Sequence, residues 1–484
     1  MKQTALEMQK KVNSMIANAK QVVASDSYRL HYHLMPPVGL LNDPNGFIYY
    51  KGKYHIFYQW NPFQTSHGAK FWGHYISDDL VHWKEAPFAL APDSWFDKDG
   101  CYSGSAIVHN DKMYLFYTGN VKDDEGNRES YQCLAVSKDG LTFEKKGPVI
   151  QVPTGYTAHF RDPKVFYQDN LWYMVLGAQT EAEQGEVVLF ASSDLVSWKF
   201  RGTLSGSNQN GLGNFGYMWE CPDLLKVNGK DILLVCPQGI QPRGFDFQNI
   251  FQSGYFAGKV DLEKAAFEHG DFIELDRGFD FYAPQTTVDE YGRQLLFGWM
   301  GNAEEEDVVQ PTVQYEWIHA LTIPRELEWK DGVLLQHPVR ELKKLRENEV
   351  GYKDVLLDSQ AKTFQHVSGS VSELIIEITE MNAENFSVQL GNSTIILFDQ
   401  SNQVLTLERE KFNGKELEQR HYSLDKLHSL HVFRDASSLE LFVNDGEAVF
   451  SARIFDQGHE IVFNVDGRVT LNVHKWDLQR TTTY

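Results

Sequence analysis

The stretch GFIYYKGKYHIFYQW, residues 46–60, decides the fold, because a similar pattern returns four more times along the chain. In each copy an apolar strand is followed by a polar turn and a second strand rich in aromatic residues, which is the pattern of a β-hairpin. The copies begin at residues 46, 105, 163, 222 and 284, so the intervals between them are 59, 58, 59 and 62 residues. This near-constant spacing predicts one structural unit that is repeated five times.

A shorter element follows each hairpin and consists of a short strand, a charged turn and an aromatic residue. The aromatic residues of the five copies are Trp83, Phe143, Trp198, Phe267 and Trp329. Together the two elements supply about four strands per unit, and propellers are built from four-stranded sheets around a central channel. The sequence therefore predicts an all-β protein with a five-bladed β-propeller.

The segments that flank the repeats have a different character. Residues 1–28 contain many helix formers and few breakers, which predicts an N-terminal helical extension before a propeller over residues 29–332. The charged stretch HPVRELKKLREN, residues 337–348, predicts a linker helix over residues 333–350. Beyond it, alternating segments such as SELIIEITEM predict a C-terminal antiparallel β-sandwich over residues 351–484.

The composition restricts the partners that the protein can have. The formal net charge of −21 repels phosphate backbones and anionic membrane surfaces, so neither nucleic acid nor a membrane is expected as a partner. No apolar run approaches the roughly 20 residues of a membrane span, and the N-terminal residues lack the apolar core of a signal peptide, so we expect a cytoplasmic location. The aromatic content of 13% suits flat surfaces that hold sugars.

The cysteines give no sign of a metal site or a disulfide framework. The four of them, Cys101, Cys133, Cys221 and Cys236, are widely spaced and form no CxxC pair, so they are expected to be reduced thiols. We expect no cofactor and no metal. The sequence leaves the oligomeric state open between a monomer and a homodimer.

Acidic residues stand at matching positions beside the first strand of several repeats. They are Asp43 in NDPNG, Asp162 in RDP and Glu220 in WECPD, and a fourth repeat contributes Asp280 in DFYAPQ slightly earlier. Because the innermost strand of every blade lines the channel, these carboxyl groups are expected to converge at one mouth of the propeller. Clustered carboxyl groups raise one another's pKa and suit a division of labour between an ionised and a protonated group, as in glycoside hydrolysis. A Ca²⁺ or Mg²⁺ site is the competing use of such a cluster.

The same motifs resemble a known family. NDPNG, RDP and EC resemble the three signature motifs of glycoside hydrolase family 32, the β-fructofuranosidases, and FYQWNP, WGH, YSGS, DFYAPQ and WMG are also similar to that family. The segment LHVFRDASSLELFVNDG resembles the β-sandwich module of the family. With the stretch QPRGFDFQNIFQSGYFAG, the chain is most similar within the family to the bacterial sucrose-6-phosphate hydrolases.

The resemblance implies roles for individual residues. Asp43 would be the nucleophile that attacks C2 of the fructosyl unit, Glu220 would protonate the leaving oxygen and then activate water, and Asp162 would hold fructose hydroxyl groups. Turn amides and Asn side chains around Asp43 would keep it ionised, and apolar neighbours of Glu220 would help it to hold a proton. Candidate substrate-binding residues are Leu41, Asn42, Gln59, Trp72, Tyr102, Ser103, Arg161, Asp280, Tyr282 and Trp299. For the two tryptophans, core packing is the alternative.

The implied activity is retaining hydrolysis of sucrose 6-phosphate, sucrose or both, which yields fructose and glucose or its 6-phosphate. Loops with His67, Lys70 and Arg243 are candidates for contact with a 6-phosphate. An exo-fructanase acting on fructo-oligosaccharides and a fructosyltransferase with the same covalent intermediate are alternatives. A noncatalytic carbohydrate-binding propeller is a third alternative, which the presence of all three acids disfavours.

Overall fold

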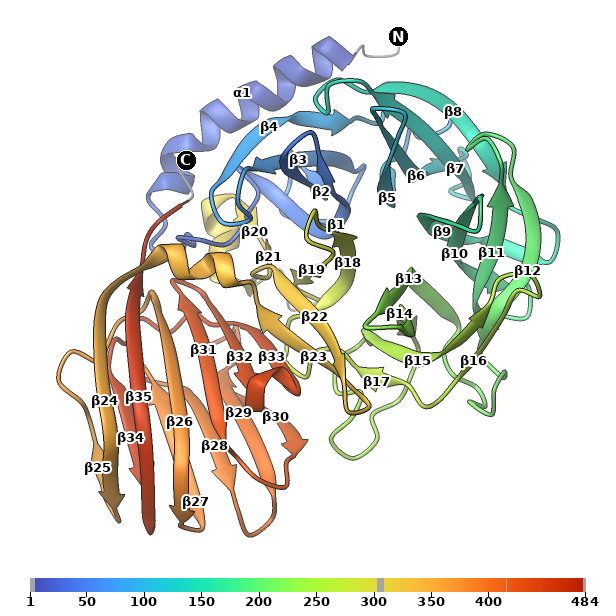
Figure 1. Cartoon of the computed structure of the whole chain (residues 1–484). Coiled ribbons are helices and arrows are strands. Elements are labelled where there is room, and N and C mark those ends of the chain that lie inside the picture. Colours follow the sequence, from blue (N-terminus) through green and yellow to red (C-terminus); the bar gives the residue numbers. More distant parts are fainter. Residues whose placement is uncertain (1–4, 303–308, 415, 482–484) are drawn as a thin grey trace.

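The computed structural model describes residues 5–302, 309–414 and 416–481. It consists of five sheets around one axis and a sandwich of two sheets beside them (Figure 1). Helix α1 (Ala5–Ala24) lies along the outer side of the first sheet, next to β4. No helix in the described part of the chain is both long and apolar enough to cross a bilayer. The all-β class, the five-bladed propeller and the C-terminal sandwich are confirmed.

Each blade is an antiparallel sheet whose strands follow one another outward from the axis. Blade I contains β1 (Gly39–Tyr50), β2 (Lys53–Asn61), β3 (Phe71–Ser77) and β4 (Trp83–Leu90). Blade II contains β5 (Cys101–His109), β6 (Lys112–Lys122), β7 (Arg128–Ser137) and β8 (Glu144–Gln151). Blade III contains β9 (Tyr156–Gln168), β10 (Leu171–Thr180), β11 (Gly185–Ser192) and β12 (Lys199–Gly206).

The last two blades carry additional short strands. Blade IV contains β13 (Met218–Val227), β14 (Lys230–Gln238), β15 (Gly254–Asp261) and β16 (Ala266–His269), and β17 (Ile273–Glu274) also pairs with β15. Blade V contains β18 (Tyr282–Val288), β19 (Gln294–Met300), β22 (Arg325–Lys330) and β23 (Val333–Pro338), and β21 (Ala320–Leu321) also pairs with β19. Pairing of β20 (Trp317–Ile318) in parallel with β1 joins the segment between β19 and β21 of blade V to blade I. This pairing closes the ring.

Every innermost strand is interrupted by a β-bulge at an equivalent place. The regular pairing is lost in β1 between Leu41 and Pro44, in β5 between Cys101 and Gly104, in β9 between Arg161 and Lys164, in β13 between Glu220 and Asp223, and in β18 between Tyr282 and Gln285. A bulge bends the strand and redirects its side chains, and it often lies beside an active site. The five bulges therefore turn the motif residues of all blades toward one end of the channel.

Three of these bulges contain a residue with a positive φ directly before a proline. The φ angles are 65° at Asp162, 49° at Cys221 and 47° at Ala283. Residues with a side chain pay a steric cost in this region, and such strain persists where the surrounding structure fixes the backbone. The strained positions therefore indicate that the surrounding structure fixes the backbone direction at the mouth of the channel despite this steric cost.

A recurring turn explains the aromatic residue of the second half-repeat. Oδ1 of Asp79 in blade I accepts hydrogen bonds from the backbone N–H groups two and three residues later, and Asp139 and Asp194 do the same in blades II and III. The indoles of Trp83 and Trp198 donate back to carbonyl oxygens of the same turns. Each such turn fixes the start of an outer strand.

The predicted linker helix over residues 333–350 is wrong in most of its length. Residues 333–338 are β23, the outermost strand of blade V, so the propeller continues past residue 332. The turn before it is Asp331–Gly332 with φ angles of 50° and 87°, the conformation of a tight two-residue hairpin turn. Only η3 (Arg340–Leu345) is helical, as a 3₁₀ turn that is anchored by the buried Leu342 and Leu345, and the first strand of the sandwich follows directly.

The sandwich consists of two six-stranded antiparallel sheets. One contains β24 (Arg346–Asp358), β35 (Arg468–Leu478), β26 (Ser372–Asn382), β31 (Ser429–Asp435), β32 (Ser438–Val443) and β33 (Ala448–Arg453). The other contains β25 (Ala361–Lys362), β34 (Ile461–Val465), β27 (Asn385–Leu390), β28 (Thr394–Asp399), β29 (Val404–Glu410) and β30 (Leu417–Ser423). Apolar side chains from both sheets form one core between them.

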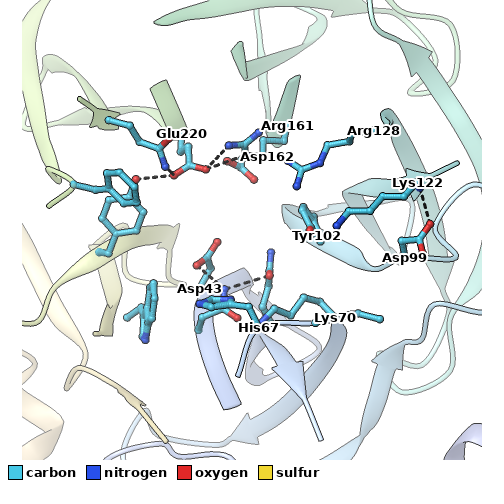
Figure 2. Close-up of a pocket in the computed structure, with 18 residues that line it drawn as sticks. Asp43, His67, Lys70, Asp99, Tyr102, Lys122, Arg128, Arg161, Asp162 and Glu220 are labelled. Atoms are coloured by element: carbon cyan, nitrogen blue, oxygen red, sulfur yellow. Dashed lines mark hydrogen bonds and ion pairs between the residues drawn. The ribbon is translucent and has the colours of Figure 1, made fainter. Parts of the chain in front are cut away.

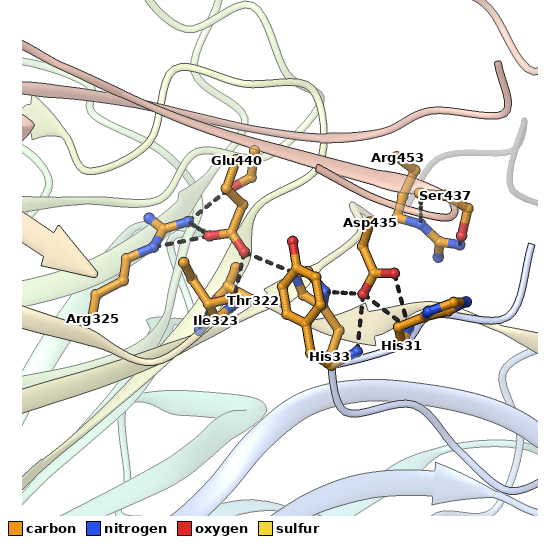
Figure 3. Close-up of polar contacts among 12 residues, drawn as sticks. His31, His33, Thr322, Ile323, Arg325, Asp435, Ser437, Glu440 and Arg453 are labelled. Atoms are coloured by element: carbon orange, nitrogen blue, oxygen red, sulfur yellow. Dashed lines mark hydrogen bonds and ion pairs between the residues drawn. The ribbon is translucent and has the colours of Figure 1, made fainter. Parts of the chain in front are cut away.

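A buried polar network joins the propeller to the sandwich (Figure 3). His33, which precedes blade I, has its Nδ1 2.8 Å from Oδ2 of Asp435 and its Nε2 3.1 Å from Oε1 of Glu440, both in the sandwich. Arg325 of blade V donates to Oε2 of the same Glu440 at 2.6 Å and to Oδ2 of Asp276 at 3.0 Å. All five side chains are completely buried. Buried charges are tolerated only when they are paired, so this network fixes how the two parts pack.

Candidate active site

A cavity of about 530 Å³ lies where the five bulges converge (Figure 2). Nine of the residues predicted from the sequence line it, namely Asn42, Asp43, Gln59, Tyr102, Arg161, Asp162, Glu220, Tyr282 and Trp299. They come from blades I, II, III, IV and V, so the site forms only when all five blades assemble. The bulged inner strands bring these side chains together.

Asp43 is held by a closed set of hydrogen bonds from blades I and II. Its Oδ1 accepts from Nδ2 of Asn42 at 2.9 Å, and its Oδ2 accepts from Oγ of Ser103 at 2.5 Å. Gln59 links the two donors, because its Oε1 accepts from Asn42 and its Nε2 donates to Ser103. Burial raises the pKa of Asp43, and the hydrogen bonds from Ser103 and Asn42 oppose that rise. These donors also fix the direction of the carboxylate.

Glu220 is surrounded by donors. Its Oε1 accepts from Nε of Arg161 at 2.9 Å and from Nη2 at 2.6 Å, and its Oε2 accepts from Gln238 and from the hydroxyl of Tyr282, both at 2.7 Å. The predicted apolar setting of Glu220 is therefore wrong. Neighbours on a strand point to opposite faces, so the fully buried Trp219 packs away from the cavity while Glu220 faces it.

Asp162 lies between the other two acids. Its Oδ2 accepts from the backbone N–H of Cys221 at 3.0 Å, and the thiol of Cys221 lies 3.6 Å from this oxygen and 3.9 Å from Oδ2 of Asp43. Burial raises the pKa of Asp162, Arg161 opposes the rise, and the charges of Glu220 and Asp43 add to it. The titration of Asp162 is therefore linked to the charges on its neighbours Arg161, Glu220 and Asp43.

Four predicted substrate-binding residues lie outside the cavity lining. Leu41 is completely buried in the core, and Trp72 is completely buried with its indole donating to the backbone oxygen of Tyr102 at 3.1 Å. Neither side chain lines the cavity, and direct contact of these two residues with a substrate stays a prediction. Ser103 is buried behind Asp43 and positions that carboxylate.

Asp280 is the fourth of these residues, and it belongs to the contact between the two parts of the protein. Its Oδ2 pairs with Nη1 of Arg409 and accepts from the backbone N–H of Arg453 at 2.8 Å, both in the sandwich. Nearby, the backbones approach so closely that a Cβ added to Gly278 would lie 2.1 Å from the carbonyl oxygen of Ser451. The prediction that Asp280 binds substrate is wrong, because two residues before the bulge the chain faces the sandwich.

The three basic residues considered for phosphate contact differ in their position relative to the cavity. His67 and Lys70 line the cavity. Lys70 is only 3% exposed, and burial lowers the pKa of its ammonium to about 7, a change that the charge of Asp43 opposes. Arg243 does not line the cavity; its side chain is 77% exposed and lies 3.8 Å from Asp246, so its predicted role is wrong.

Seven further lining residues were not predicted as site residues, namely Gly68, Ala69, Asp99, Lys122, Arg128, Gln238 and Phe251. Gln238 ends the apolar strand DILLVCPQ, where a polar amide needs a partner, and that signal could have identified it. Lys122 and Arg128 flank a charged turn, VKDDEGNR, that reads as a solvated loop tip. Among the described residues, no group of three His, Cys, Asp or Glu side chains is arranged to hold a metal ion.

Comparisons with known proteins show the family of this chain. Residues 33–338 match the N-terminal domain of glycosyl hydrolases family 32, and residues 341–477 match its C-terminal domain. The chain is 49% identical over 483 residues to the sucrose-6-phosphate hydrolase of Bacillus subtilis, with 98% of both chains covered. It is 44% identical over 431 residues to the sucrose-6-phosphate hydrolase of Salmonella typhimurium, with 89% of both covered.

Solved structures give the same result. The sucrose-6-phosphate hydrolase of Lactobacillus gasseri superposes with a TM-score of 0.88 at 34% identity, covering 97% of both chains. A mutant β-fructofuranosidase of Bombyx mori in complex with sucrose superposes with a TM-score of 0.87 at 36% identity, covering 99% of this chain and 100% of that one. The chain therefore belongs to glycosyl hydrolase family 32 and is a glycosidase of the β-fructofuranosidase type.

Proposed function

We propose that this glycosidase hydrolyses the β-fructofuranosyl linkage of sucrose 6-phosphate, and more slowly that of sucrose, with retention of configuration. The observation that carries the proposal is the pair formed by Asp43 and Glu220 in one cavity, each fixed by its own donors. The names of the relatives support the phosphorylated sugar as substrate.

In the first step the carboxylate of Asp43 attacks C2 of the fructosyl unit, and the bond between C2 and the glycosidic oxygen breaks. Glu220 transfers a proton to that oxygen, so glucose 6-phosphate leaves as a neutral alcohol at the reacting position. The hydrogen bonds from Asn42 and Ser103 orient Asp43 before the attack. This orientation removes part of the entropic barrier.

In the second step Glu220 takes a proton from a water molecule whose oxygen attacks C2, and the ester bond to Asp43 breaks. The four hydrogen bonds that Glu220 accepts from Arg161, Gln238 and Tyr282 suit the carboxylate form that this step needs. The first step needs Asp43 ionised while Glu220 carries the proton, and the hydrogen bonds that Asp43 accepts from Asn42 and Ser103 favour its carboxylate form.

Asp162 and Trp299 shape the part of the cavity that receives the fructosyl unit. Asp162 offers carboxylate oxygens to hydroxyl groups and stabilises the positive charge that develops at C2. Trp299 is 2% exposed, lines the cavity, and has a buried indole N–H without a partner among the described residues. Its ring supplies an apolar wall and its N–H can donate to a sugar oxygen.

A substrate panel tests the proposal. We expect kcat/KM to decrease from sucrose 6-phosphate to sucrose, then to raffinose, 1-kestose and inulin. Equal values for the first two substrates would remove the phosphate preference, and a higher value for 1-kestose or inulin would favour an exo-fructanase. We also propose a cytoplasmic location, because a charged sugar phosphate does not cross a membrane unaided.

A further inference from the structure

Two cationic side chains lie directly opposite each other on neighbouring strands at the rim of the cavity. Lys122 is the last residue of β6 and Arg128 is the first of β7, and the two are paired in the strand register. Like charges directly opposite each other destabilise a β-ladder. A nearby anion would therefore be needed to offset the repulsion between these two side chains.

No such anion is supplied by the part of the chain that the structure describes. Neither side chain forms an ion pair there, although the chain contains 66 acidic and 45 basic residues. Asp99 also lines the cavity, but its Oδ2 accepts from the backbone N–H of Lys122 at 2.6 Å and lies 3.9 Å from Nζ of Lys98. Asp99 therefore fixes the backbone of Lys122 and does not pair with its ammonium.

A third cation on the same side of the cavity is buried without a partner. Lys70 is 3% exposed, and its Nζ forms no hydrogen bond within the described residues. Its carbonyl oxygen accepts from the backbone N–H of Cys101 at 2.8 Å, which holds this segment against blade II. A buried amine without a partner is costly, and a ligand can supply the missing acceptor.

The three cations lie on the side of the cavity where Tyr102 lies, across from Glu220 (Figure 2). The guanidinium carbon of Arg128 is 5.8 Å from the centroid of the Tyr102 ring, a contact that orients the guanidinium group. Asp43, Glu220 and Asp162 hold the reacting centre on the other side. A substrate that fills the cavity therefore has its reacting bond at the carboxyl groups and its far end at the cations.

We propose that Lys122 and Arg128, with Lys70 beneath them, form a subsite that binds the 6-phosphate of the leaving sugar. This inference rests on the proposed hydrolysis of sucrose 6-phosphate. The fork of the Arg128 guanidinium matches two oxygens of one phosphate, whereas the ammonium groups of Lys122 and Lys70 act as point charges. A dianion at this position offsets the repulsion between Lys122 and Arg128.

The experiment compares Lys122→Gln, Arg128→Gln and the double variant with the parent enzyme on sucrose 6-phosphate and on sucrose. The quantity of interest is the ratio of kcat/KM for the phosphorylated sugar to kcat/KM for the free sugar. We expect this ratio to fall about tenfold for Arg128→Gln, less for the more exposed Lys122→Gln, and further in the double variant. Lys112→Gln is the matched control, because Lys112 begins the same strand β6 at its opposite end.

Two further measurements keep the outcomes distinct. Inhibition by glucose 6-phosphate is expected to weaken in the double variant relative to inhibition by glucose, and thermal midpoints confirm that the variants are folded. A parent enzyme that cleaves both sugars equally well would overturn the proposed substrate and the subsite together. A parent enzyme that prefers the phosphorylated sugar, combined with an unchanged ratio in a folded double variant, would overturn the subsite alone.

Discussion

Arg161 directs two N–H groups, at 2.9 and 2.6 Å, onto a single oxygen of Glu220. The two residues are 59 positions apart, which is the interval of the repeat, and they occupy equivalent places in the bulges of blades III and IV. The other oxygen of Glu220 remains available to Gln238 and Tyr282. The propeller repeat thus places a cation and a carboxylate side by side although they are far apart in the sequence.

The first prediction separates the roles of Asp43 and Glu220. Asp43→Asn removes the nucleophile and is expected to abolish hydrolysis of sucrose and of an aryl fructoside alike. Glu220→Gln removes the proton donor, so kcat/KM on sucrose should fall by about 10²–10⁴. The loss of the first step should be much smaller on an aryl fructoside, whose leaving group needs no proton.

The measurement is the pre-steady-state burst of phenol release, which reports the first step alone. Gln248→Glu is a suitable control, because Gln248 lies in an exposed loop outside the cavity lining and its described hydrogen bonds go to nearby backbone oxygens. Equal losses for Glu220→Gln on both substrates would argue against its role as the proton donor.

The second prediction concerns pH dependence. The positive charge of Arg161 holds down the pKa of the buried Asp162, which burial otherwise raises. Removing that charge in Arg161→Gln raises the pKa of Asp162 further, so Asp162 keeps its proton to higher pH. The acidic limb of the kcat/KM profile should therefore move toward alkaline pH. An unchanged acidic limb, or a shift toward acidic pH, would show that Arg161 does not govern the titration of Asp162.

The third prediction concerns Asp280. Asp280→Asn leaves the buried Arg409 without its full partner, and breaking a buried pair costs about 3–5 kcal/mol. The thermal midpoint should therefore fall by several degrees, while KM for sucrose stays near that of the parent enzyme. Asp261→Asn is the control, because its partner Lys264 is solvent-exposed. A large rise in KM without loss of thermal stability would restore Asp280 to the binding site.

The fourth prediction concerns the buried His33. Burial alone would lower the pKa of His33, but its hydrogen bonds to Asp435 and Glu440 raise it above the ordinary value. The resulting stability is present below about pH 6.5 and is lost as the pH rises through the raised value. The thermal midpoint of the parent enzyme should exceed that of His33→Gln by more at about pH 6 than at about pH 9.

Asp435→Asn combined with His33→Gln provides the control for this network. With the principal charge partner of His33 removed, the difference between the double variant and Asp435→Asn should lose most of its dependence on pH. A difference between the parent enzyme and His33→Gln that grows with rising pH would contradict the assignment.

Much of the fold could be predicted because its determinants are local. Each hairpin carries its own turn residues, and the recurring turns built on Asp79, Asp139 and Asp194 involve bonds within three residues. The linker was mispredicted for a local reason as well. The Asp331–Gly332 turn lies at the predicted boundary between propeller and linker. The charged stretch of residues 337–348 is typical of a helix, whereas residues 333–338 form β23, the strand that pairs with β22.

The site residues could be predicted from the sequence only where they belong to the same short motif as the strand that carries them. Asp43 and Asp162 lie inside the bulges and Glu220 lies at the edge of one, so their convergence follows from the repeat. Asp280 was misassigned because its partner Arg409 is 129 residues away in another domain. The opposition of Lys122 and Arg128 follows from a strand register that a charged turn sequence does not reveal.

The most direct test of the central claim is to trap the covalent intermediate on Asp43. Glu220→Gln is mixed with an aryl fructoside, quenched in acid, digested and examined by mass spectrometry. The account predicts that the peptide containing Asp43 gains the mass of one anhydrohexose unit, and that this adduct is absent when Asp43→Asn is added. An adduct on another residue, or release of fructose with inverted configuration and no adduct, would contradict the account.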